Sequence, residues 1–291
     1  GNPMAISPKP KAYYPIGDKA AFNGSEYLVT NAASEVYSPY ALDFDGTDDK
    51  INFSSSIDLG LNNSVSAWVK LNSGYSGALF GETSYGSSGY FLLPYSTGFI
   101  IRIGNTIAFA SSYLIPSGSW QNMTVVRNGS NFLLYLNGAY IETVTLSSTT
   151  NTKFDIIGNS RTGADPIEGS LSNVSAFNAP LTSTQVTEIY NSGKPSNLNT
   201  HSAYSNLVSW WQLGENSSFD GTNWTVLDEK GTNNGTSANM GEDAIVNGVN
   251  TTGNGITNGM TDNIVGDSPY STGNSLSYGM GVDALSTDVP S

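Results

Sequence analysis

The sequence predicts an all-β protein folded as a two-sheet antiparallel sandwich, and three observations support this. Only 12% of the 291 residues are charged, so the polar surface comes mostly from Ser, Thr, Asn and Gly, which favour turns over helices. Aromatic residues make up 11% of the chain, with 16 tyrosines, and aromatic side chains suit pleated strands. Short segments of alternating polarity recur along the chain, each bounded by Gly, Ser or Pro.

The first strands are expected after an extended N-terminal arm over residues 1–11, where three prolines oppose helix formation. Residues 41–53 alternate apolar and polar side chains around an Asp-Gly turn. Residues 64–72 place small and branched apolar side chains on one face and Trp68 on the other. Further short strands are predicted at 77–82, 89–95, 99–104 and 106–111.

The second half of the sandwich begins with the clearest hairpin signal, at residues 120–146. Asn128-Gly129 and Asn137-Gly138 are dipeptides typical of type I′ turns, so three strands are expected here. Two more strands are predicted at 154–159 and 169–178. One short helix near 182–192 follows, with Thr182 or Ser183 as its N-cap and Gly193 as its stop.

Four of these segments resemble, in the same order, the sequence blocks of laminin-G-like, concanavalin A-like jelly-roll domains. They are ALDFDGTDDKINF (41–53), SVSAWVK (64–70), WQNMTVVRNGSNFLLYLNG (120–138) and GSLSNVSAFNAPLTSTQVTEIYNSG (169–193). The resemblance covers residues 10–194, and it implies a concanavalin A-like jelly roll over residues 12–194.

The opening segment of the chain occurs twice, because residues 10–27 and 207–224 share a pattern at an offset of 197. Tyr13-Tyr14 aligns with Trp210-Trp211, Gly17 with Gly214, Asp18 with Glu215, Phe22 with Phe219, Gly24 with Gly221 and Tyr27 with Trp224. In the family, such a segment opens the domain. We therefore expect residues 195–291 to form a long irregular C-terminal arm that begins with a partial repeat of the opening strand, 207–226.

Charge and composition exclude several classes of function. The net charge of −13 leaves no basic patch for nucleic acid and disfavours anionic membrane surfaces. No apolar run reaches the roughly 18 residues that a membrane helix needs, so no membrane insertion is expected. The first 30 residues lack a secretory-signal pattern, and the absence of cysteine excludes disulfides and thiolate metal sites.

The densest group of carboxylates is DFDGTDD, with Asp43, Asp45, Asp48 and Asp49 around a glycine. Oxygen ligands arranged around such a turn suit Ca²⁺, and the resemblance implies a calcium ion at the sandwich rim. Ser172-Asn173 stand where the family carries an acidic pair, so a ligand from that strand is not expected. The alternative is a plain Asp-Gly turn with solvated carboxylates.

Aromatic side chains supply the candidate ligand-binding and interface residues. Four tyrosines in loops rich in Gly and Ser are candidates for stacking on a sugar ring: Tyr75, Tyr85, Tyr90 and Tyr95. The alternative is that they only cover the edges of the core. Adjacent aromatic residues on a strand face opposite ways, so one ring of each pair must be covered by a loop or lie at a subunit interface. The candidates for that interface are Tyr13, Tyr14, Trp210, Trp211 and Trp224.

Catalysis is not expected. A glucanase on this fold needs two carboxylates that flank the sugar bond, and the acids of the predicted sandwich are scattered over separate segments. The single histidine, His201, lies in a linker, and no sequence motif indicates a nucleophile near it.

Three functions fit these features. The first is a virion structural or surface protein, a capsid decoration or tail-fibre component that contacts its own copies or other virion proteins and binds host-surface glycans. The jelly-roll segments together with the long Asn/Gly/Ser/Thr-rich C-terminal segment resemble structural proteins of marine phages, and the low content of Lys and Arg suits saline surroundings. The second is an extracellular, secreted or cell-surface carbohydrate-binding adhesin. The third is a glycan-active enzyme on the same fold.

Overall fold

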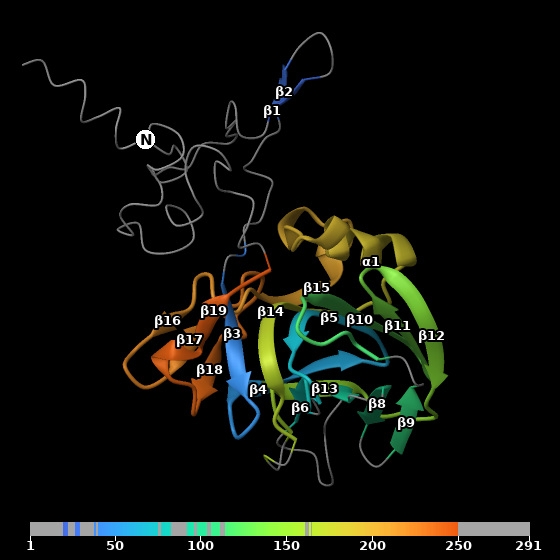
Figure 1. The fold of residues 1–291 in the computed structure, drawn as a ribbon. Coiled ribbons are helices and arrows are strands. Elements are labelled where there is room, and N and C mark those ends of the chain that lie inside the picture. The colour runs from blue at the N-terminus through green and yellow to red at the C-terminus, as the bar shows by residue number, and fades with distance from the viewer. Residues whose placement is uncertain are drawn as a thin grey trace, which may run out of the picture. The chain divides into compact units, whose positions relative to one another are not determined.

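The computed structural model describes residue 38 and residues 40–74, 77–82, 92–95, 98–103, 106–110, 114–160, 163 and 165–249. It also describes the backbone of two short strands, β1 (Ala20–Phe22) and β2 (Tyr27–Val29), which pair antiparallel. The chain divides into two compact units, Gly1–Pro39 with Asn250–Ser291, and Tyr40–Val249. The unit Tyr40–Val249 is a sandwich of two antiparallel sheets, as the sequence predicts (Figure 1).

The first sheet has the strand order β12-β11-β10-β5-β14-β3-β19, and β15 also pairs with β14. Its strands are β3 (Tyr40–Asp45), β5 (Asn62–Leu71), β10 (Gln121–Asn128), β11 (Asn131–Leu136), β12 (Ala139–Thr145), β14 (Glu168–Phe177), β15 (Leu207–Trp211) and β19 (Ile245–Asn247). β14 is long enough to pair with two strands along one edge. Its first half pairs with β3 and its second half with β15.

The second sheet has the order β16-β17-β18-β4-β13-β6-β7-β8-β9. Its strands are β4 (Lys50–Gly60), β6 (Phe80–Gly81), β7 (Leu92–Tyr95), β8 (Gly98–Ile103), β9 (Thr106–Ala110), β13 (Thr152–Ile157), β16 (Ser218–Phe219), β17 (Trp224–Val226) and β18 (Gly235–Ala238). The core lies between the sheets. At its centre Phe154 makes ring contacts with Phe53, Phe80 and Trp211, with centroids 4.8–6.1 Å apart.

The predicted hairpin is present as β10, β11 and β12, but its first turn differs from expectation. Asn128 pairs with Asn131, so the two loop residues are Gly129 and Ser130. Gly129 has φ of 63°, whereas Ser130 is not among the residues with positive φ, which fits a type II′ turn with glycine first. The second turn follows the prediction, because Asn137 and Gly138 have φ of 51° and 75°.

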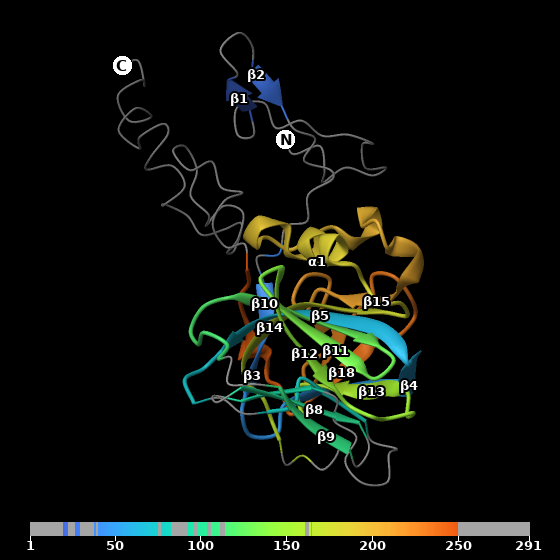
Figure 2. The same cartoon turned by 90° about the vertical axis from the view of Figure 1, so that its right-hand side faces the viewer.

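A helical layer covers the outer face of the first sheet (Figure 2). It comprises α1 (Ser183–Tyr190) and the 3₁₀ helices η3 (Asn191–Gly193), η4 (Leu198–Thr200) and η5 (Tyr204–Asn206); a further 3₁₀ helix, η6 (Glu242–Ala244), precedes β19. Thr182 caps α1 in a capping box with Gln185, and the helix ends at Asn191, in the left-handed conformation, two residues before the predicted Gly193. Trp68, on the outer face of β5, stacks on Tyr190 with ring centroids 5.9 Å apart.

Residues 207–249 differ from the expected irregular arm, because they supply five strands to the sandwich. β15 pairs with β14, β18 pairs with β4, and β19 pairs with β3. These strands are only two to five residues long, so their own periodicity does not reveal them. The arm at residues 1–11 and the segment 250–291 lie outside the described residues.

Candidate functional site

The acidic turn, Asp45 to Asp49, connects β3 of the first sheet to β4 of the second and therefore lies at the rim of the sandwich. One carboxylate oxygen from each of Asp45, Asp48 and Asp49 lies within 4.8 Å of the other two. The Thr47 N–H donates to Asp45 Oδ1 at 2.7 Å, and the Asp45 N–H donates to Asp49 Oδ2 at 3.0 Å. The backbone of the turn thus fixes two of the three carboxylates.

Asp49 is the most perturbed of these groups. Its side chain is 5% exposed, whereas Asp45 and Asp48 are exposed to solvent. The pKa of Asp49 is raised from 3.8 to about 6, mainly by burial and also by the negative charges of Asp45, Asp48 and Asp43, while the hydrogen bond from the Asp45 N–H acts in the opposite direction. At neutral pH this turn therefore holds a poorly solvated charge beside like charges, which a cation would stabilise.

The fourth predicted ligand, Asp43, has a different role. Its Oδ1 accepts a hydrogen bond from Ser170 Oγ at 2.7 Å, across the β3–β14 pair. Ser172 and Asn173 serve the strand pairing, since the Asn173 N–H donates to the Gln212 carbonyl oxygen at 3.0 Å. Asp45, Asp48 and Asp49 offer three carboxylate oxygens of the kind that Ca²⁺ binds among its roughly six to eight ligands, so the residues present fit this ion.

The candidate sugar-stacking tyrosines fall outside what the structure describes. Tyr75, Tyr85 and Tyr90 lie outside the described residues, and Tyr95 is described only as the last backbone position of β7. Their role in ligand binding therefore stays a prediction.

The three candidate interface tryptophans are buried within the chain. Trp211 points into the core, where its ring lies 4.7 Å from that of Phe53, and its Nε1–H donates to the Asn233 carbonyl oxygen. Trp210 faces the opposite way, and its Nε1–H donates to Asn173 Oδ1. Trp210, Trp211 and Trp224 are 1%, 0% and 5% exposed, so they leave no ring for a partner chain, and that expectation is wrong for them. Tyr13 and Tyr14 lie outside the described residues.

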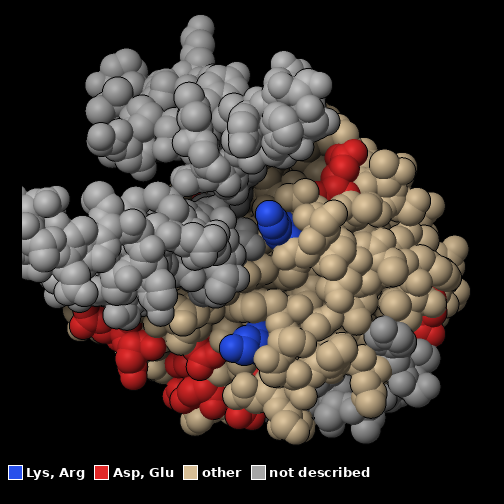
Figure 3. Space-filling model, turned by 45° about the horizontal axis from the view of Figure 1, so that its top comes forward, with Lys and Arg blue, Asp and Glu red and all other residues tan. Residues whose placement is uncertain are grey.

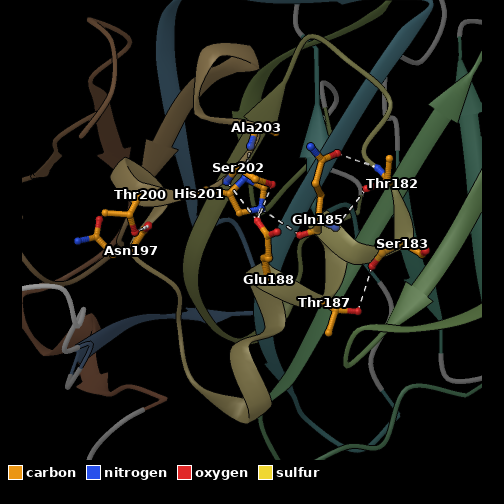
Figure 4. Close-up of polar contacts among 10 residues, drawn as sticks. All are labelled: Thr182, Ser183, Gln185, Thr187, Glu188, Asn197, Thr200, His201, Ser202 and Ala203. Atoms are coloured by element: carbon orange, nitrogen blue, oxygen red, sulfur yellow. Dashed lines mark hydrogen bonds and ion pairs between the residues drawn. The ribbon is translucent and has the colours of Figure 1, made fainter. Parts of the chain in front are cut away.

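His201 forms a polar cluster with α1 that the sequence did not indicate (Figure 4). Its Nδ1 accepts from the Ala203 N–H, and its Nε2 lies 3.0 Å from the Gln185 carbonyl oxygen. The Ser202 hydroxyl donates to Glu188 Oε2 at 2.6 Å, and this bond is the main cause that lowers the pKa of Glu188. Both ring nitrogens contact backbone groups and Ser202 faces a carboxylate, so the cluster joins α1 to the following segment rather than forming a nucleophile–base pair.

Neutral side chains dominate the face of the described part that Figure 3 shows. Acidic groups gather mainly along its lower left edge, and basic groups are few and separate. Among the described residues, no helix is long and apolar enough to cross a membrane.

Comparison with known proteins supports the fold that these elements define. Residues 45–187 match a family model, Laminin_G_3, described as the concanavalin A-like lectin/glucanases superfamily. Together with the two sheets and the short helix α1, this match identifies the fold of the sandwich as a laminin-G-like, concanavalin A-like jelly roll. No curated protein sequence matches the chain.

The chain is also similar to several solved structures at low sequence identity. A protein from Bacteroides ovatus with a suggested carbohydrate-binding role is 13% identical, with a TM-score of 0.55; the match covers 78% of this chain and 64% of that one, less than two thirds of its length. A heptameric SAP-like pentraxin from Limulus polyphemus is 14% identical, with coverage of 72% and 100% and a TM-score of 0.46. Domains LG4-5 of the mouse laminin alpha1 chain are 14% identical, with coverage of 52% and 44% and a TM-score of 0.38.

Proposed function

We propose that this protein is a carbohydrate-binding module without catalytic activity. The observation that carries the proposal is the match of residues 45–187 to a lectin/glucanase family, on a sandwich that has the corresponding fold. The suggested carbohydrate-binding role of the Bacteroides ovatus protein is in line with it. The low share of charged residues, 12%, and the mostly neutral face in Figure 3 suit neutral sugars, whose hydroxyl groups bind polar neutral side chains while their apolar faces stack on aromatic rings.

Within this function, Tyr75, Tyr85, Tyr90 and Tyr95 are the proposed stacking residues. A matched control is available in Tyr140 on β12, which is 54% exposed and is not in those loops. In a glycan array with the full chain, we expect binding that falls at least tenfold when a stacking tyrosine is replaced by alanine. Tyr140→Ala should leave binding unchanged.

Two results would contradict this function. Absence of binding to every glycan on the array would remove the lectin role. Release of shortened sugars during incubation would instead show a glycan-active enzyme.

We further propose that Asp45, Asp48 and Asp49 hold one Ca²⁺, which would neutralise the acidic turn and fix the start of β4. Titration calorimetry with CaCl₂ should show one binding event per chain that Asp49→Asn abolishes. Asp58→Asn is the matched control. Asp58 lies on β4, outside the acidic turn, and its Oδ2 forms an ion pair with Lys153 Nζ at 3.1 Å. Equal calcium binding by Asp49→Asn and the unmodified chain would rule the site out.

The setting we propose for this module is the surface of a virus particle, in contact with its own copies or other virion proteins. The support is the sequence alone, in its low charge and its Asn/Gly/Ser/Thr-rich C-terminal segment. Mass spectrometry of purified particles should detect the chain at a constant ratio to the major capsid protein. Its recovery only in the particle-free medium would instead favour a secreted adhesin.

A further inference from the structure

The repeated sequence segments form the same hairpin twice. In the unit Gly1–Pro39 with Asn250–Ser291, Phe22 of β1 pairs with Tyr27 of β2. In the sandwich, Phe219 of β16 pairs with Trp224 of β17. The neighbouring pairs also correspond, Ala21 with Leu28 and Ser218 with Thr225, so strand register and repeat agree at the same offset of 197.

The copy in the sandwich, residues 207–226, pairs with two strands. β15 pairs with residues Val174–Phe177 of β14, and β17 pairs with β18 (Gly235–Ala238). We call the surface formed by these residues of β14 and β18 the opening slot. Within this slot the repeated residues make specific contacts. Gly214 has φ of 141°, and a Cβ there would lie 2.7 Å from Tyr40 Cβ, so only glycine fits. Glu215 Oε1 accepts from the Tyr40 N–H at 2.8 Å.

The hairpin end of the slot has equally specific requirements. The rings of Phe219 and Trp224 lie 5.3 Å apart, and the turn between them contains Gly221 with φ of 97°. The N-terminal copy offers a residue of the same kind at every one of these positions: Gly17, Asp18, Phe22, Gly24 and Tyr27. At these five positions residues 10–29 therefore match the glycine, acidic and aromatic requirements that residues 207–226 fulfil.

We propose that residues 10–29 are a second occupant of the opening slot of their own chain, in exchange with residues 207–226. The chain is long enough for this exchange. Asp18 would take the position of Glu215 beside Tyr40. The 10 residues that follow the hairpin, 30–39, lead back to Tyr40 and span about 35 Å when extended. A tethered segment also has a high effective concentration at its own slot, which favours it over a second copy.

The two copies differ in how tightly we expect them to bind the opening slot. Each of the three tryptophans donates a hydrogen bond through its indole N–H: Trp210 to Asn173 Oδ1, Trp211 to the Asn233 carbonyl oxygen and Trp224 to the Gly241 carbonyl oxygen. Tyrosines stand at the aligned positions and lack an indole N–H. Ile16 aligns with Leu213, whose φ of 56° is unfavourable for a β-branched residue. Residues 207–226 are thus the preferred occupant, and replacing these tryptophans by tyrosine brings the two copies closer to balance.

Disulfide trapping in the full chain tests the exchange, because the chain has no cysteine of its own. Ser209 pairs directly with Ala176 on β14, and Ala12 aligns with Ser209 in the repeat. The variant Ala176→Cys with Ser209→Cys reports the pairing seen in the structure, and Ala176→Cys with Ala12→Cys reports the exchanged pairing. Ala12→Cys with Thr145→Cys, an exposed position on β12, controls for random collision. Peptide mapping after mild oxidation measures each link, and circular dichroism confirms folding.

We expect a small yield of the 12–176 link in the otherwise unmodified chain. It should rise at least tenfold when Trp210, Trp211 and Trp224 are replaced by tyrosine, while the 12–145 link stays at background. A folded triple variant without the 12–176 link, or with no more of it than of the 12–145 link, would overturn the proposal. A 12–176 link found only between two chains would also overturn it, since the occupant would then come from a second copy.

Discussion

Replacement of Asp49 by asparagine should stabilise the calcium-free protein above pH 7. Asp49 is 5% exposed, and its pKa is raised from 3.8 to about 6 by burial and by neighbouring carboxylates. At 1.36 kcal/mol for each pKa unit, that difference corresponds to a destabilisation of at most about 3 kcal/mol when the group is ionised. Asparagine removes the charge and keeps an oxygen that can accept the Asp45 N–H.

The sign of the effect fixes its pH dependence. Because the folded pKa lies above the unfolded value, the cost of Asp49 is complete above pH 6, shrinks as the pH falls toward 3.8, and is absent below that value. The advantage of Asp49→Asn should therefore be about 3 kcal/mol at pH 8 and under about 0.5 kcal/mol at pH 3.5.

Urea unfolding in EDTA at both pH values, followed by tryptophan fluorescence, measures this difference. Asp48→Asn is the control, because Asp48 carries the same charge in the same turn but is exposed to solvent. Its effect should stay below about 1 kcal/mol. A loss of stability in Asp49→Asn at pH 8, or a gain of equal size at pH 3.5, would refute the reasoning.

Three further substitutions test the fold by thermal or urea unfolding. Arg127→Lys should cost about 3 kcal/mol or more, because the buried guanidinium donates to three carbonyl oxygens and to Thr152 Oγ1, which one ammonium cannot reproduce; an unchanged midpoint would contradict this. Gly158→Ala should lower the free energy of unfolding by about 3 kcal/mol, because φ is 90° and a Cβ would lie 2.2 Å from Phe44 Cε1. An unchanged stability would show that the Phe44 ring can move away without cost. Thr182→Ala should cost about 1 kcal/mol through loss of the α1 cap, whereas Thr182→Ser should cost far less.

Sequence reasoning predicted the elements whose signals are local. The β10–β12 hairpin follows from two turn dipeptides, α1 follows from its cap and apolar spacing, and the acidic turn is contiguous in the chain. Details that depend on register were missed. The position of Asn128 in its turn is set by its pairing with Asn131, and a one-residue shift decides between the two turn types.

The role of residues 207–249 could not be predicted, because their partners lie far away in the sequence. β18 pairs with β4, whose residues precede it by more than 170 positions, and a strand of four residues has no usable periodicity of its own. The burial of both Trp210 and Trp211 has the same origin. One ring enters the core and the other is bonded to Asn173, a contact that only the β14–β15 pairing creates.

The late position of β15 and β18 has a consequence for synthesis on the ribosome. Every strand of the jelly roll up to β14 is made before residue 178, but the edges of β14 and β4 gain their partners only when residues 207–238 emerge. Until then a nascent chain exposes the unpaired edges of β14 and β4 and the apolar surface on which Trp211 later packs, which favours aggregation. If the exchange proposed above occurs, residues 10–29, which are made first, would cover the edge of β14 during that interval and would be displaced when the tryptophans emerge.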